Sequence, residues 1–111
     1  MNKLFYATIK EFTLMLVKNE IPFSYSLLYD GAQWSFPKFK GDISIHSGTY
    51  ASDRGYLESY NMPWDEDDVS VCTPEEMIEL LNGNKSNKEY EYHYTPDDTF
   101  NSLSTLLNLG E

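Results

Sequence analysis

The chain has 111 residues, 41% hydrophobic and 15% aromatic, which fits one small globular domain over residues 1–111 and excludes a disordered chain. Its formal net charge of −10 disfavours direct binding to DNA or RNA, because contacts with phosphates need lysine and arginine. The single cysteine, Cys72, excludes an internal disulfide and fits a reducing cytoplasm. We expect no membrane span, because no apolar run approaches the roughly 20 residues that cross a bilayer.

The acidic charge is concentrated in the second half of the chain. Residues 1–55 hold six basic and five acidic side chains, whereas residues 56–111 hold two basic and thirteen acidic ones. Such a surface suits a basic protein partner, or it serves solubility alone.

The first elements are predicted to be one helix and three strands. Apolar side chains recur at three- and four-residue spacings over residues 2–19, which indicates an amphipathic helix, and Pro22 prevents it from continuing. Alternating residues predict antiparallel strands at 23–29, 32–37 and 42–47.

The Asp30-Gly31 pair predicts the turn between the first two strands, because a two-residue type I′ turn needs positive φ at both positions. Farther on, Tyr56-Leu57-Glu58 is compatible with the start of a short helix, and residues 69–72 with a short strand or sheet edge. Thr73 and Glu76 predict a capping box that starts a second helix.

The C-terminal part adds two more predicted elements. Residues 89–94 alternate strictly, which indicates a half-exposed strand, and a last helix is expected over residues 95–110. The predicted fold class is therefore α+β, with an N-terminal helix, an antiparallel sheet of three to four strands, and two further helices packed on it.

The stretch 41–58 carries the most unusual polar residues. Hydroxyls and glycines surround Arg54, the only arginine, whose guanidinium suits a phosphate or carboxylate. We predict a small-ligand pocket here, because an otherwise acidic chain needs a local positive group to hold a phosphorylated ligand and Arg54 supplies it. The candidate ligand-binding residues are His46, Ser47, Thr49, Tyr50, Arg54 and Tyr56. The alternative is that His46 is hydrogen-bonded at the edge of the core and Arg54 pairs with a neighbouring acid.

Neither catalysis nor metal binding is expected. His46 and Ser47 near Asp42 suggest nucleophilic catalysis, but adjacent residues of a strand point to opposite faces. The two histidines lie far apart in the sequence, and no spacing typical of metal ligands occurs. We therefore expect a protein that is not an enzyme and has no metal or other cofactor.

A second candidate site lies in the acidic half. Carboxylates on a small protein imitate the phosphates of a nucleic acid, so they suit a basic enzyme that binds DNA or RNA. The candidate partner-binding residues are Asp65, Glu66, Asp67, Asp68, Glu75, Glu76 and Glu79. The alternative is a solvated acidic face with no partner.

Four motifs carry a resemblance, namely D-G-x-Q-W-x-F-P at 30–37, G-D-I-S-I-H-S-G-T-Y at 41–50, G-Y-L-E at 55–58 and T-P-E-E at 73–76. Through them, about residues 20–82 resemble a small family of proteins encoded by phages and prophages of Gram-positive bacteria. The resemblance implies an accessory protein that disarms a host defence, and it supplies no catalytic residue.

Two functions follow from these expectations. The leading one is an anti-defence sponge, a homo-oligomer in the host cytoplasm that sequesters a small nucleotide-derived immune signal around Arg54. The alternative is an acidic, nucleic-acid-mimicking inhibitor of a host defence nuclease, of the anti-CRISPR type.

Overall fold

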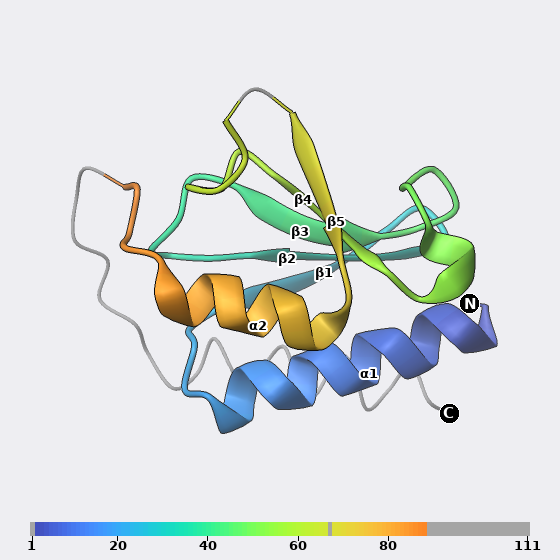
Figure 1. Cartoon of the computed structure of the whole chain (residues 1–111). Coiled ribbons are helices and arrows are strands. Elements are labelled where there is room, and N and C mark those ends of the chain that lie inside the picture. The colour runs from blue at the N-terminus through green and yellow to red at the C-terminus, as the bar shows by residue number, and fades with distance from the viewer. Residues whose placement is uncertain (1, 67, 89–111) are drawn as a thin grey trace.

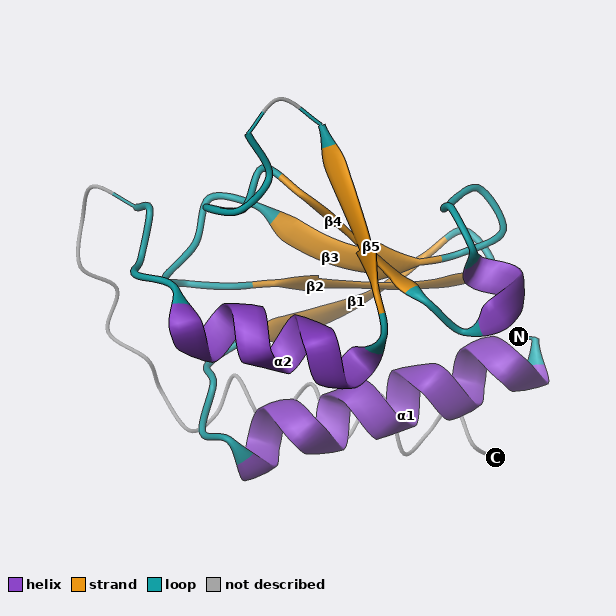
Figure 2. Cartoon of the chain, viewed as in Figure 1, coloured by secondary structure: helices purple, strands orange, loops and turns teal. Residues whose placement is uncertain are grey.

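The computed structural model describes residues 2–66 and 68–88, and these residues form an α+β fold (Figure 1). The elements, in chain order, are α1 (Lys3–Lys18), β1 (Ser24–Leu28), β2 (Gly31–Ser35), β3 (Asp42–Ile45), the 3₁₀ helix η1 (Ser52–Arg54), β4 (Leu57–Tyr60), β5 (Val69–Cys72) and α2 (Pro74–Gly83). The strands form one antiparallel sheet whose spatial order, β1-β2-β3-β4-β5, is also the chain order. Helices α1 and α2 lie on the same face of this sheet (Figure 2).

Helix α1 confirms the prediction from its apolar spacing. It begins after Asn2, whose side-chain Oδ1 accepts hydrogen bonds from the backbone N–H groups of Leu4 at 2.7 Å and Phe5 at 3.4 Å. This cap satisfies backbone donors that have no partner within the helix. The buried side chains of α1 are Phe5, Thr8, Ile9, Phe12, Thr13 and Leu16, and they form the stripe that packs on the sheet.

Trp34 of β2 lies at the centre of the core and is fully buried. Its indole Nε1 donates a hydrogen bond to Thr13 Oγ1 at 3.0 Å, and its ring meets the ring of Phe12 edge-on at 4.9 Å. Because a buried indole N–H without a partner is costly, Thr13 fixes how α1 sits on the sheet.

The predicted hairpin between β1 and β2 is confirmed, but its turn lies one residue earlier than expected. Leu28 pairs with Gly31, so Tyr29 and Asp30 form the loop. Of the residues in this turn only Tyr29 has a positive φ, of 54°, so the type I′ expectation is wrong. Gly31 is required for a different reason, because a Cβ at this position would lie 1.8 Å from the carbonyl oxygen of Ile45 on β3.

The sheet has five strands rather than three to four, and the expected helix start at Tyr56-Leu57-Glu58 is wrong. Residues 57–60 form β4, which pairs with β3 on one side and β5 on the other. Leu57 and Ser59 are fully buried on the face covered by the helices. The short strand predicted at residues 69–72 is confirmed as β5.

Helix α2 starts with the predicted capping box. Thr73 Oγ1 accepts from the backbone N–H of Glu76 at 3.3 Å, and Glu76 Oε1 accepts from the backbone N–H of Thr73 at 3.0 Å. The hydrogen bonds from Thr73, first from its backbone and then from its side chain, lower the pKa of Glu76. The predicted strand at 89–94 and the last predicted helix at 95–110 lie outside the described residues.

Candidate functional site

The central stretch forms a tight turn directly after β3. The hydroxyl of Thr49 donates to the carbonyl oxygen of His46 at 2.8 Å and accepts from the backbone N–H of His46 at 3.2 Å. The imidazole Nδ1 of His46 accepts from the backbone N–H of Gly48 at 3.0 Å. These polar groups therefore bond to one another and hold the turn.

Two carboxylates already accept hydrogen bonds from Ser47 and Tyr50, two residues that were predicted to bind a ligand. Asp30, from the β1–β2 turn, accepts from the backbone N–H of Ser47 at 2.9 Å and from its hydroxyl at 2.5 Å. The bond from the hydroxyl, followed by the bond from the N–H, lowers the pKa of Asp30. Glu58 accepts from the backbone N–H of Tyr50 at 2.9 Å. An anionic ligand at this turn would have to displace these two carboxylates.

The loop that follows presents a cation and one exposed ring, and a second exposed ring, Tyr29, comes from the β1–β2 turn. Arg54 ends η1, is exposed, and forms no ion pair with any residue of the described part of the chain. Tyr50 is 70% exposed and Tyr29 is 85% exposed, and the Tyr29 ring packs edge-on against His46 at 5.1 Å. Tyr56 is half-buried. The structure therefore brings His46, Ser47 and Thr49 into one turn, with Tyr50, Arg54 and Tyr56 on the segment that leads to β4.

Most of the predicted acidic site is exposed. The exposed carboxylates are those of Glu66, Asp68, Glu75, Glu76 and Glu79, the last three on α2, while Asp67 lies outside the described residues. One residue from each acidic segment, Glu76 and Asp65, acts on the thiol of Cys72. Burial raises the pKa of the Cys72 thiol, and the negative charges of Glu76 and then Asp65 raise it further.

Asp65 corrects the expectation of a solvated acid, because it is 93% buried, with 7% of its surface exposed. Its Oδ2 accepts from the hydroxyl of Ser59 at 2.7 Å and from the backbone N–H of Met62 at 3.3 Å. Ser59 in turn accepts from the indole Nε1 of Trp64 at 2.9 Å. The second oxygen, Oδ1, is buried and has no hydrogen-bond partner. A buried carboxylate oxygen without a donor is rare in folded proteins.

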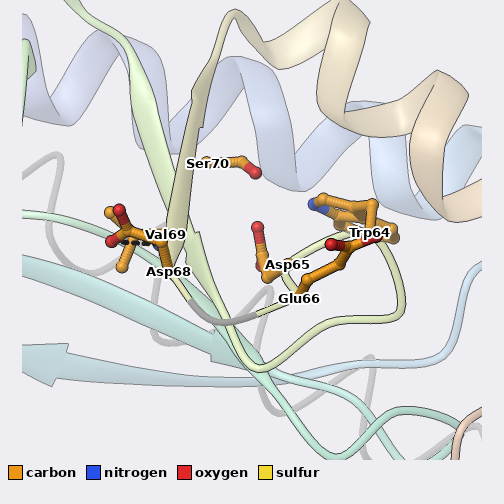
Figure 3. A pocket seen from close by; sticks show the side chains of 6 residues that line it. All are labelled: Trp64, Asp65, Glu66, Asp68, Val69 and Ser70. Carbon is orange, nitrogen blue, oxygen red and sulfur yellow. Dashed lines mark hydrogen bonds between the residues drawn. The ribbon is translucent and has the colours of Figure 1, made fainter.

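A cavity of about 320 Å³ lies beside Asp65, between β5 and the loop that precedes it (Figure 3). Its lining residues are Trp64, Asp65, Glu66, Asp68, Val69 and Ser70. Figure 3 shows the Asp65 side chain pointing toward Ser70 on β5, with Trp64 and Glu66 next to it and Asp68 pointing away. No pattern in the sequence predicted this cavity. Its only signal was Trp64, an aromatic residue immediately before the acidic run.

Among residues 2–66 and 68–88, no three His, Cys, Asp or Glu side chains are grouped so that they would hold a metal ion. Within the same described residues, neither helix has the length and apolar character needed to cross a bilayer. Comparisons of the chain with protein-family models, with curated proteins and with solved structures give no match.

Proposed function

We propose that this protein is a non-enzymatic inhibitor that uses its acidic surface to occupy the nucleic-acid-binding site of a basic partner. The observation that carries the proposal is the set of exposed carboxylates in the two segments that flank β5, at Glu66 and Asp68 before the strand and at Glu75, Glu76 and Glu79 after it. Exposed carboxylates on one helix and on the neighbouring loop offer a basic protein several negative charges at once.

The partner class follows from the charge and from the phage resemblance. A nuclease that binds DNA or RNA carries a positively charged groove, and an acidic protein competes for it. We propose a nuclease of a bacterial defence system, of the kind that anti-CRISPR proteins block, encountered in the host cytoplasm. The proposal needs no cofactor and no direct contact between this protein and nucleic acid.

Neutralising two carboxylates on α2 tests the acidic surface. We expect the double variant Glu75→Gln/Glu79→Gln to need an about tenfold higher concentration to displace fluorescent DNA from the target nuclease. The displacement is measured by fluorescence anisotropy over a panel of purified defence nucleases, at several salt concentrations. Wild-type displacement is expected to weaken as salt rises, because exposed charges are screened.

The matched control changes the net charge by the same amount elsewhere. Glu11 on α1 and Asp53 on η1 are both exposed, so Glu11→Gln/Asp53→Asn removes two negative charges outside the acidic surface. This control is expected to displace DNA as well as the wild type does. Equal weakening of the two double variants would show that only net charge matters and would contradict the proposal.

A second candidate function, the nucleotide sponge, is favoured by one observation. Arg54 is exposed and unpaired within the described residues, and the exposed ring of Tyr50 lies on the same loop. A guanidinium and an aromatic ring together suit a phosphate and a base. It ranks second because Asp30 and Glu58 already occupy the neighbouring backbone donors. In this candidate the ligand lies at or near the interface of a homo-oligomer.

A thermal-shift screen with cyclic nucleotides and ADP-ribose derivatives tests the sponge. A ligand at a hundredfold excess over its Kd is expected to add about 2.7 kcal/mol to the free energy of unfolding. Arg54→Ala is expected to abolish this shift, whereas Lys10→Ala, at an exposed position of α1, is expected to retain it. An unchanged melting temperature with every nucleotide would leave the acidic inhibitor as the only proposed function.

A further inference from the structure

We propose that the cavity beside β5 is a guanidinium pocket that receives an arginine side chain of the partner. The starting point is Asp65 Oδ1, a buried carboxylate oxygen that no group of the protein satisfies. Such an oxygen is costly to leave unpaired, and a rotation of the Asp65 side chain toward the cavity would let a charged donor there satisfy it. The cavity lies directly beside this carboxylate (Figure 3).

The residues that line the cavity favour an organic cation as the ligand. Asp65 supplies a negative charge, the Ser70 hydroxyl has lone pairs to accept a second N–H, and Trp64 supplies an aromatic ring. Guanidinium matches this set, because it carries only donors in a plane and stacks on aromatic faces. A hard metal ion would need six or more oxygen ligands, whereas the described residues offer no cluster of three.

The cavity is large enough to admit an arginine side chain. At about 320 Å³ it lies at the lower limit of small-molecule sites, which span about 300–1,000 Å³. Glu66, exposed at the rim, adds a second negative charge where the aliphatic part of an arginine would leave the cavity. A nucleotide would be repelled by these two carboxylates.

The assignment of this arginine to a nucleic-acid-binding partner rests on the proposed function. Nucleic-acid-binding surfaces are rich in arginine, because its planar group binds phosphates in a bidentate manner. An inhibitor that occupies such a surface meets these arginines first. Asp65 would take the place that a phosphate holds in the natural complex, with the exposed carboxylate of Glu66 next to it (Figure 3).

The pocket is testable without any partner. The protein has two tryptophans, so its ¹⁵N NMR spectrum contains two indole N–H signals, which Trp64→Phe assigns. Titration with N-acetyl-arginine methylamide is expected to shift the Trp64 signal saturably, with a Kd on the order of 1 mM, and to leave the signal of buried Trp34 in place. The citrulline analogue, neutral and of the same shape, is expected to cause no shift.

Two variants assign the shift to the proposed contacts. Asp65→Asn is expected to weaken binding of the arginine probe at least about tenfold, and Ser70→Ala to weaken it less. Asp53→Asn is the matched control, because Asp53 is exposed on η1 and lies outside both the cavity and the predicted acidic site; we expect less than about a twofold change. If Asp65→Asn does not fold, Glu66→Gln and Ser70→Ala decide, and both must weaken binding for the pocket to stand.

The outcomes separate the pocket from the proposed function. Equal shifts with the arginine and citrulline probes, or no shift with either, would overturn the pocket. Probe binding without displacement of DNA from any nuclease would leave the pocket and refute the inhibitor. Displacement that survives Asp65→Asn but is lost in Glu75→Gln/Glu79→Gln would leave the inhibitor and refute the arginine contact.

Discussion

Replacing Gly31 with alanine is expected to lower the free energy of unfolding by about 3 kcal/mol, the upper end of typical overpacking costs. The added Cβ would lie 1.8 Å from the carbonyl oxygen of Ile45 and 2.8 Å from its carbonyl carbon. Both atoms belong to the backbone of β3, so no side-chain rotation relieves the contact. Strands β2 and β3 would have to separate where β2 begins and β3 ends, and urea unfolding followed by circular dichroism measures the resulting loss of stability.

Gly83 provides the matched control for this substitution. It is the last residue of α2, and a Cβ built there meets no atom within 4 Å. Gly83→Ala is expected to leave stability unchanged or to raise it by up to about 1 kcal/mol, because alanine loses less backbone freedom on folding. If the two alanine variants unfolded at the same urea concentration, the close approach of β2 and β3 would be refuted.

Two leucines of α1 give the second large expected effect. Leu16 is fully buried, whereas Leu14 is 51% exposed. Leu16→Ala is expected to cost about 2–5 kcal/mol, because it removes buried apolar surface and leaves a cavity. Leu14→Ala is expected to cost about 0.5 kcal/mol or less. The helix and the chemical change are the same in both variants, so the difference in their melting temperatures measures burial alone.

The expected order of these two variants depends on the rotation of α1 about its axis. A helix turned so that Leu14 faced the sheet would reverse the order of the two melting temperatures. The hydrogen bond between Trp34 Nε1 and Thr13 Oγ1 argues against that rotation, because it fixes Thr13 toward β2. Equal destabilisation by both substitutions would show that the side chain of Leu14 is as buried as that of Leu16, and would contradict the exposure of Leu14.

Both long helices were predictable because their signals are local. The apolar spacing before Pro22 is sufficient to define α1, and Thr73, Pro74 and Glu76 carry the complete chemistry of a helix start. The β1–β2 hairpin was predictable for the same reason. Its turn was misplaced because Gly31 satisfies a contact with β3, whereas the sequence argument assumed that it supplied a positive φ.

Strand β4 and the buried acid were not predictable from local patterns. The inward face of β4 carries Ser59 where an apolar residue is usual, so the alternation that marks a half-buried strand is weak. Ser59 is buried because it links Asp65 and Trp64. Four consecutive acids indicate a solvated loop, and only tertiary contacts separate Asp65 from its neighbours.

Three of the polar residues singled out in the central stretch, His46, Ser47 and Thr49, lie in one turn of the structure. Their hydrogen-bond partners could not be predicted. Asp30 reaches Ser47 from 17 positions earlier in the chain, and this contact depends on the register of β1, β2 and β3. The ligand-binding role of this turn stays a prediction.

The simple strand order has a consequence for how the chain folds. Each strand pairs with the next one in the sequence, so the whole sheet can assemble through short loop closures, which favours rapid folding. Helix α1 is different, because it contacts α2, and Asn82 of α2 donates to Asn19 at 3.3 Å, 63 positions away. During synthesis α1 therefore leaves the ribosome before the helix that it packs against. The part of α1 that packs against α2 stays accessible to chaperones until α2 has been made.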